Sequence, residues 1–237
     1  MRWIFRTFRF WMITTVLSIV LGSSAVIVRL FDASGNTSHK ISSLWGRLLC
    51  KWNDIRVEVR GVENILPDRA QIFVANHQSF FDIFALSGYL PVQIRWVAKS
   101  SLFHIPFVGW AMWASNYIPV LRENRKKAYK AFLATIERIK SGASVVIFPE
   151  GTRSSDGEIG EFKKGGHLLA ARSKAPMTPV TIIGTGVIIQ KGSFIIKPGR
   201  VQIIISSTVK AKGEDTLNEI REIICKCYEE HTIDVKS

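Results

Sequence analysis

From residue 54 onward, short runs rich in β-branched and aromatic residues alternate with longer segments of helical periodicity. This alternation favours an α/β fold, in which a mixed, mostly parallel sheet is flanked by helices, because parallel strands need crossover connections. Helical periodicity is found in 125–140, 163–173 and 215–230. The strand-like runs are 55–60, 71–75, 94–98, 116–121, 144–148, 177–183, 193–197 and 201–206.

The last two strand-like runs are separated by a short segment that contains Pro198 and Gly199. A Pro-Gly pair is a turn signal, so the sequence predicts a β-hairpin here, and the hairpin is the reason to expect a mixed sheet. The chain is long enough for one substantial core. We therefore expect residues 54–237 to form one domain, preceded by a separate N-terminal segment, residues 1–53.

Residues 10–28 contain no charged side chain and are bounded by Arg9 and Arg29. A helix needs about 20 apolar residues to cross a bilayer, so this run is just long enough, although Ser and Thr residues dilute it. Aromatic and basic residues precede it, which is typical of a membrane–water interface. A secretory signal peptide is the alternative interpretation, since Ser23-Ser24-Ala25 resembles a weak cleavage site.

A second N-terminal segment, residues 41–52, has apolar residues at helical spacing with basic residues alongside. A helix of this kind either lies in the headgroup layer of a membrane or packs its apolar face on the protein core. Basic residues flank both ends of the 10–28 run, so charge does not decide its orientation. We expect two helices, joined by a linker at 32–39, to form a hairpin that dips into one leaflet and anchors the following domain.

The chain carries 32 Lys and Arg residues against 19 Asp and Glu residues, a formal net charge of +13. Such an excess suits nucleic acid, an anionic membrane or an acidic substrate. The sequence has no RNA-recognition motif, zinc-finger spacing or basic leucine-zipper pattern, so nucleic acid is not expected as a partner. It also has no group of ligating residues at metal-site spacing, and we expect no metal. A membrane and a phosphate-bearing substrate account for the charge.

The most informative local pattern places His77 and Asp82 five positions apart, directly after the strand-like run 71–75. Ligands of open α/β sheets collect at the carboxyl ends of strands, and a His held by a carboxylate can activate a hydroxyl. Five residues correspond to about 140° on a helix, so the two do not share a helical face. We expect His77 in the turn before a helix and Asp82 in its first turn. The alternative is that Asp82, three residues after Ser79, only caps that helix.

A second strand-to-loop exit carries polar side chains in Phe148-Pro149-Glu150-Gly151-Thr152-Arg153-Ser154. Two further blocks complete the pattern, one with Lys99, Leu102, Pro106, Gly109 and Arg122, the other with Pro179 and Val180. In this order and spacing, over about residues 55–210, the four blocks resemble the glycerolipid acyltransferases. The resemblance is specifically to the 1-acylglycerol-3-phosphate acyltransferases, in which the first block is a His-x4-Asp motif.

The resemblance implies transfer of a fatty acyl group to the 2-hydroxyl of 1-acylglycerol-3-phosphate (lysophosphatidic acid), which gives phosphatidic acid. The acyl donor would be acyl-CoA or acyl carrier protein, and no cofactor is implied. His77 would be the general base and Asp82 would orient its imidazole, as in a Ser-His-Asp triad with the substrate hydroxyl in place of the serine. The implied substrate-binding residues are Lys99, Arg122, Glu150, Gly151, Thr152 and Arg153, with Arg153 first for the phosphate because its guanidinium is a bidentate donor.

An enzyme that uses acyl thioesters is expected to face the cytoplasm, with residues 54–237 as its membrane-anchored acyltransferase domain. The first alternative is the same chemistry on another lysophospholipid or an acyl-amino-acid lipid, for which loss of the phosphate-directed cations would matter less. A non-enzymatic basic membrane-binding module is a more distant alternative. It leaves the two polar loops at strand ends unexplained.

Overall fold

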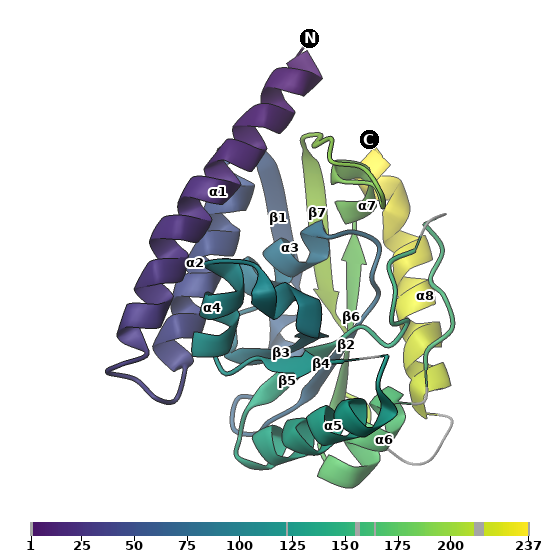
Figure 1. Ribbon diagram of the computed structural model, residues 1–237. Helices are drawn as coiled ribbons and strands as arrows, with labels where there is room; N and C mark the ends of the chain where they lie inside the picture. Colours follow the sequence, from purple (N-terminus) through teal and green to yellow (C-terminus); the bar gives the residue numbers. More distant parts are fainter. Residues whose placement is uncertain (1, 122, 155–156, 164, 211–215, 237) are drawn as a thin grey trace.

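The computed structural model describes residues 2–121, 123–154, 157–163, 165–210 and 216–236 (Figure 1). Within them, seven strands form one sheet in the order β1-β7-β6-β2-β5-β3-β4. All neighbouring strands run parallel except β6 and β7, so the predicted α/β fold with a mixed, mostly parallel sheet is confirmed. The strands are β1 Ile55–Arg60, β2 Ile72–Ala75, β3 Ile94–Lys99, β4 Ile118–Val120, β5 Ser144–Ile147, β6 Met177–Ile183 and β7 Gly199–Ile205.

The predicted hairpin between 194–197 and 201–206 is wrong, because 193–197 is a loop. β7 lies between β1 and β6, so both of its edges are already paired and no edge is left for a hairpin partner. The sheet is mixed for a different reason: β7 follows β6 in the chain and returns antiparallel to it.

Two apolar clusters cover the two faces of the sheet, because alternate strand residues point to opposite sides. Phe73 and Ala75 belong to one cluster, together with buried residues of α1, α2 and α3 (Phe81–Tyr89). Ile72 and Val74 belong to the other, with residues of α5 (Arg125–Lys140), α6 (Gly165–Ser173) and α8 (Thr216–Lys236). The helices expected at 125–140, 163–173 and 215–230 correspond to these last three.

Short helical elements were not predicted. They are α4 (Val108–Ala114), α7 (Thr185–Ile188) and two 3-10 turns, Val62–Asn64 and Ser100–His104. α4 begins after Phe107, which has a positive φ of 62°, and its seven residues are too few to give a clear helical period. It lies against α1, so the block that runs from Lys99 to Arg122 is next to the N-terminal hairpin.

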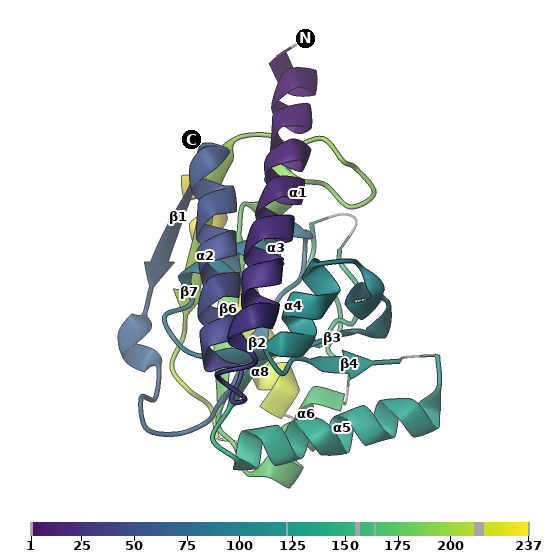
Figure 2. The same ribbon diagram turned by 60° about the vertical axis from the view of Figure 1, so that its left-hand side comes forward.

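α1 (Arg2–Val28) and α2 (Asn36–Trp52) lie side by side and antiparallel, as Figures 1 and 2 both show. The predicted two-helix arrangement is present, with α2 starting inside the expected linker. Among the described residues, Trp3–Val28 is the one helix that is long and apolar enough to cross a membrane, by length and composition. Phe10 and Leu17 of this helix are buried in the core cluster, packing that a cleaved signal peptide would not provide.

The hairpin is fastened to the sheet through its linker. Arg95 of β3 donates to the Ser34 carbonyl at 3.1 Å and to Asn36 Oδ1 at 2.6 Å. Asp32 accepts from the backbone N–H of Ser34 at 2.9 Å in the linker and from that of Thr37 at 2.8 Å, a free donor in the first turn of α2. These contacts fix where the two helices lie relative to the strands.

α2 packs on the protein core, one of the two arrangements that its sequence allows. A Cβ atom at Gly46 would lie 2.6 Å from the Phe84 carbonyl oxygen and 2.9 Å from the Gly88 nitrogen, so α2 and α3 are in backbone contact. Leu49 and Cys50 of α2 are fully buried. α1 instead keeps an exposed apolar side, to which Phe5, Phe8 and Val16 contribute.

Candidate active site

The site begins where β2 ends. Asn76, the residue after β2, is fully buried and bridges to β6: its Nδ2 donates to the Ile182 carbonyl at 2.9 Å and its Oδ1 accepts from Ile182 N at 2.7 Å. Side-chain bonds thus continue the β2–β6 pairing past the last strand residue. His77 follows immediately, so its backbone is fixed relative to the sheet.

His77 lies in the turn before α3 and Asp82 in the first turn of that helix, as predicted. His77 Nδ1 is 2.7 Å from Asp82 Oδ2, and the Asp82 side chain is completely buried. The same Oδ2 accepts from the backbone N–H groups of Gln78 and Ser79, both at 2.9 Å. Asp82 therefore both caps the helix and holds the imidazole, so the two interpretations of this residue are compatible.

The His77 ring is also held by an aromatic stack. It lies 4.0 Å from the Phe148 ring with an interplanar angle of 12°, and Trp96 stacks on Phe148 at 5.7 Å. With Nδ1 directed at Asp82 and one ring face covered, Nε2 is the nitrogen left for a substrate hydroxyl. This arrangement fixes the tautomer and the ring plane, as general-base catalysis requires.

Glu150 braces the two polar loops. Its Oε1 accepts from His77 N at 2.7 Å and its Oε2 accepts from Gly160 N at 3.1 Å, while Ser154 N donates to the His77 carbonyl at 2.9 Å. Burial raises the pKa of Glu150, and the bonds from His77 and Gly160 lower it. Both carboxylate oxygens are thus occupied by backbone donors, so Glu150 can shape the substrate site through the loops it joins.

The far side of this loop is held by α8. Arg221 donates to the carbonyls of Gly160 at 2.8 Å and Ile159 at 2.7 Å. Tyr228 donates to Gln78 Oε1 at 3.1 Å, and Gln78 Nε2 reaches the Gly157 carbonyl at 2.7 Å. Neither α8 residue lies in a recognisable block, so the sequence offered no signal for this role.

A cavity of about 510 Å³ opens beside His77. Its lining includes His77, Lys99, Gly151, Thr152, Arg153 and Lys191, so four of the predicted substrate residues share one cavity with His77. Glu150 does not line it, and Arg122 lies outside the described residues. Lys99 is half-exposed and also 3.4 Å from Glu123. Lys191 was not predicted, because it lies outside all four sequence blocks.

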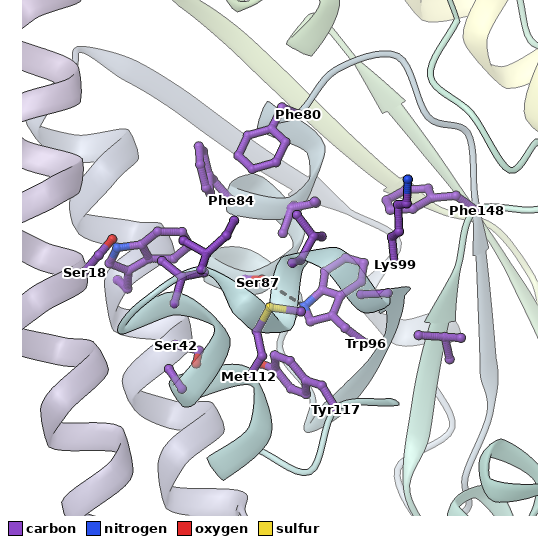
Figure 3. A pocket seen from close by; sticks show the side chains of 18 of the residues that line it. Ser18, Ser42, Phe80, Phe84, Ser87, Trp96, Lys99, Met112, Tyr117 and Phe148 are labelled. Carbon is purple, nitrogen blue, oxygen red and sulfur yellow. Dashed lines mark hydrogen bonds between the residues drawn. The ribbon is translucent and has the colours of Figure 1, made fainter. Parts of the chain in front are cut away.

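The rest of the cavity is mainly apolar and runs between the sheet, α3, α4 and the N-terminal hairpin (Figure 3). Figure 3 shows Phe148 and Lys99 at one end of it and Ser18 and Ser42 at the other. Of the apolar residues in the block that runs from Lys99 to Arg122, Leu102, Ile105 and Val108 line the cavity, whereas Trp110 and Trp113 are exposed. The hairpin contributes wall residues from both of its helices: Ser18, Leu21, Gly22, Ile41, Ser42 and Trp45.

His39 and His104 do not form such a pair. His39 is buried against Tyr117, with Nδ1 2.8 Å from the phenol oxygen, and burial lowers its pKa to about 4. His104 is exposed on a 3-10 turn and does not line the cavity. Among the described residues, no group of three or more His, Cys, Asp or Glu side chains is placed to hold a metal ion.

Comparisons with known proteins identify relatives of this chain. The chain is 35% identical over 216 residues to a chloroplastic 1-acyl-sn-glycerol-3-phosphate acyltransferase of Arabidopsis thaliana, covering 90% of this chain and 60% of that protein. It is 37% identical over 161 residues to a Pseudomonas aeruginosa protein of the same name, covering 68% of this chain and 62% of that protein. The chain therefore spans roughly 60% of the length of these relatives.

A solved structure covers nearly the whole chain. The 1-acyl-sn-glycerophosphate (LPA) acyltransferase PlsC from Thermotoga maritima superposes with a TM-score of 0.85 at 32% identity, covering 97% of this chain and 95% of that chain. The acyltransferase family model matches residues 56–183, which is more than half of the chain and includes His77, Asp82 and Arg153. This protein belongs to the acyltransferase family.

Proposed function

We propose that this protein transfers a fatty acyl group from a thioester to the 2-hydroxyl of 1-acylglycerol-3-phosphate, giving phosphatidic acid. The observation that carries the proposal is the position of the His77–Asp82 pair at the cationic end of a long apolar cavity. A hydroxyl activated there lies between a site for phosphate and a site for hydrocarbon. The names of the plant, bacterial and Thermotoga relatives support the choice of acceptor.

In the reaction, His77 Nε2 takes the proton of the acceptor hydroxyl as its oxygen attacks the thioester carbonyl carbon. The imidazolium that forms is stabilised by Asp82 Oδ2, 2.7 Å from Nδ1. When the tetrahedral intermediate collapses, the carbon–sulfur bond breaks, and the thiolate takes the proton from Nε2. The proton thus moves from the acceptor to the leaving thiol, and His77 returns to its starting state without a covalent intermediate.

The acceptor phosphate is assigned to Arg153 and Lys191, with Lys99 beside them. A guanidinium gives two parallel bonds to phosphate oxygens, and an ammonium gives a point charge. Gly151 leaves room for a further cation: a Cβ there would lie 2.9 Å from Lys163 Nζ. Gly151 also has a φ of 75°, so any other residue would be strained as well as crowded.

The acyl donor is proposed to be acyl-CoA or acyl carrier protein, both of which suit the basic surface. The proposed chemistry needs no metal or cofactor. We expect activity to survive EDTA; a loss that a divalent ion restores would contradict this.

We propose that the protein is anchored to the cytoplasmic face of a membrane through α1. Its exposed apolar side would lie in one leaflet, while α2 lies between α1 and α3. One pass through the bilayer is less compatible with this arrangement, because α1 is packed along α2 and contributes to the cavity wall. Protease protection of the chain in sealed, inside-out membrane vesicles would test the orientation.

The proposal is tested by acyl transfer to lysophosphatidic acid with wild type, His77→Ala and a matched control, His104→Ala. We expect His77→Ala to lower kcat by at least about 10³-fold, since it removes the base and its oriented proton path, while His104→Ala keeps near-wild-type rates. Near-wild-type turnover by His77→Ala would exclude the proposed base. If the wild type prefers lysophosphatidylcholine, the proposed acyl transfer stands but the proposed acceptor is wrong. Absence of transfer with every lysolipid would favour a non-enzymatic membrane module.

A further inference from the structure

The loop between α7 and β7, residues 190–197, exposes two large apolar side chains side by side. Phe194 is 74% exposed and Ile195 is 52% exposed. Two neighbouring apolar residues at a loop tip are costly in water and typically mark an interaction site. Neither residue contributes to the sheet or to the cavity wall.

The loop is held in this position by α1. Trp11 Nε1 donates to the Phe194 carbonyl at 2.9 Å, and the two rings meet edge to face with centroids 6.0 Å apart. Ile196 N donates to Thr7 Oγ1 at 3.2 Å, and the Ile196 side chain is fully buried. With its backbone bonded and the next side chain buried, the loop presents its tip in a defined place.

The tip extends the exposed apolar side of α1. The side chains of Phe5, Phe8 and Met12 are each at least half exposed. Their spacing of i, i+3 and i+7 places them in one stripe along the helix. Each residue turns the helix by about 100°, so Trp11, which contacts the loop, lies about 60° from Phe8 on the flank of that stripe, and Thr7 lies further round the helix. Phe194 and Ile195 therefore add to the exposed apolar surface of α1.

The charge around the tip fits an anionic partner. Lys191 and Lys197 flank the two apolar residues, and both are exposed. The sequence has no Asp or Glu between Glu161 and Glu214, so the loop itself and the chain on either side of it carry no acidic side chain. Aromatic side chains prefer the headgroup level of a bilayer, and nearby Lys residues are attracted to anionic lipid phosphates.

We propose that the 190–197 loop is a second membrane contact, in which Phe194 and Ile195 insert into the headgroup region of an anionic bilayer beside α1. The inference rests on the proposed membrane association and adds a site to it. Because Lys191 of the same loop lines the cationic end of the cavity, insertion places that end at headgroup level, where an acceptor phosphate lies. The loop thus joins the bilayer surface to the active site.

The test uses the full-length protein with Cys225→Ser and Cys227→Ser, which leaves only the buried Cys50. A nitrobenzoxadiazole probe is attached in turn to Phe194→Cys, to Phe8→Cys on α1 as positive control, and to Ser141→Cys as negative control. Ser141 is exposed after α5, at the other end of the molecule from the N-terminus of α1 (Figure 1). Quenching is measured in phosphatidylglycerol vesicles with doxyl-labelled acyl chains.

We expect strong quenching at positions 194 and 8 and little at 141. Quenching at 8 with position 194 no different from 141 would overturn the loop contact and leave α1 as the anchor. No quenching at 8 or 194 would overturn the proposed membrane association together with the loop contact.

A functional arm uses the double variant Phe194→Ser with Ile195→Ser, whose exposed positions leave the core unchanged. Apparent affinity for vesicles should fall at least about tenfold, because the apolar burial of two large side chains is lost. Turnover with acceptor in detergent micelles should match wild type. Equal vesicle affinity of the variant and wild type would also overturn the proposal.

Discussion

Replacing Glu150 with Gln keeps the shape of the side chain and removes one of its two acceptor oxygens. In the structure both oxygens are used, Oε1 by His77 N at 2.7 Å and Oε2 by Gly160 N at 3.1 Å. A Gln amide has one oxygen and one NH₂ group, so one backbone N–H would face another donor. The change therefore breaks one end of the brace between the two active-site loops.

The expected magnitude combines three contributions. Losing a hydrogen bond to a charged acceptor costs about 1.5–3 kcal/mol, and the orphaned N–H adds a desolvation cost. Burial raises the pKa of Glu150, so a neutral Gln recovers part of the cost of burying the charge. We expect a net loss of about 2 kcal/mol in the free energy of unfolding. We also expect kcat to fall about tenfold or more, because His77 loses its backbone anchor.

Unfolding in detergent, followed by tryptophan fluorescence, and steady-state kinetics with lysophosphatidic acid would measure both effects. Glu161→Gln is the matched control, since Glu161 is in the same loop with an exposed side chain. If Glu150→Gln unfolds like the control and keeps its kcat, the brace is refuted. A rise in KM alone would instead mean that Glu150 contacts the substrate.

Three further predictions concern the cations, the helix contact and pH. Arg153→Ala and Lys191→Ala should each raise KM for lysophosphatidic acid about 10–100-fold with little change in kcat, since each removes a charge-assisted phosphate bond; unchanged KM values in steady-state kinetics would contradict this. Gly46→Ala should lower the free energy of unfolding by about 1–3 kcal/mol, because the new Cβ would lie 2.6 Å from the α3 backbone. The control Gly165→Ala, whose Cβ would have nothing within 4 Å, should not lower it. Equal melting temperatures of the two variants would contradict the backbone contact between α2 and α3. His39 has a pKa lowered from 6.5 to about 4 by burial, so the unfolded chain takes up its proton first as pH falls. Stability should therefore drop by about 2 kcal/mol between pH 7 and 5 in wild type and less in His39→Gln, as measured by denaturant unfolding.

The sequence predicted the parts of the site that depend on short local patterns. His77 and Asp82 are joined by one turn, so their spacing alone places one before the helix and one inside it. Arg153 and Gly151 follow β5, and the neighbouring pairing of β2 with β5 brings their loop to His77. Strand ends in a parallel sheet meet at one edge, which is why two separate blocks could be expected to form one site.

The parts that were missed depend on contacts distant in sequence. Lys191 reaches the cavity because the loop before β7 is held against α1, a contact between residues more than 180 positions apart. The β-hairpin at Pro198-Gly199 was predicted from a local turn signal. It does not form because β7 lies between β1 and β6, and strand order depends on tertiary packing. Arg221 and Tyr228 brace the loops from α8, where their local surroundings resemble any amphipathic helix.

The N-terminal hairpin is part of the active site as well as the proposed anchor, and this leads to a last prediction. Phe10, Leu17 and Leu49 are buried in the same cluster as the sheet, and Trp45 lines the cavity. A chain without the hairpin lacks these three side chains and loses about 1.5–3 kcal/mol of burial from each. Together these losses approach the whole stability of a typical domain, about 5–15 kcal/mol.

We therefore expect a chain that starts at Asn53 to lose cooperative unfolding and acyl transfer together, even with short-chain acceptors that need no membrane. The measurement is calorimetry and turnover of the truncated chain in detergent beside the full-length protein. A truncated chain that melts cooperatively and turns over short-chain acceptors at the full-length rate would show that the hairpin serves only as an anchor. The shared burial and the shared cavity wall argue for the opposite outcome, because α1 has both the apolar side proposed to meet the lipid and residues that line the cavity proposed for the acyl chain.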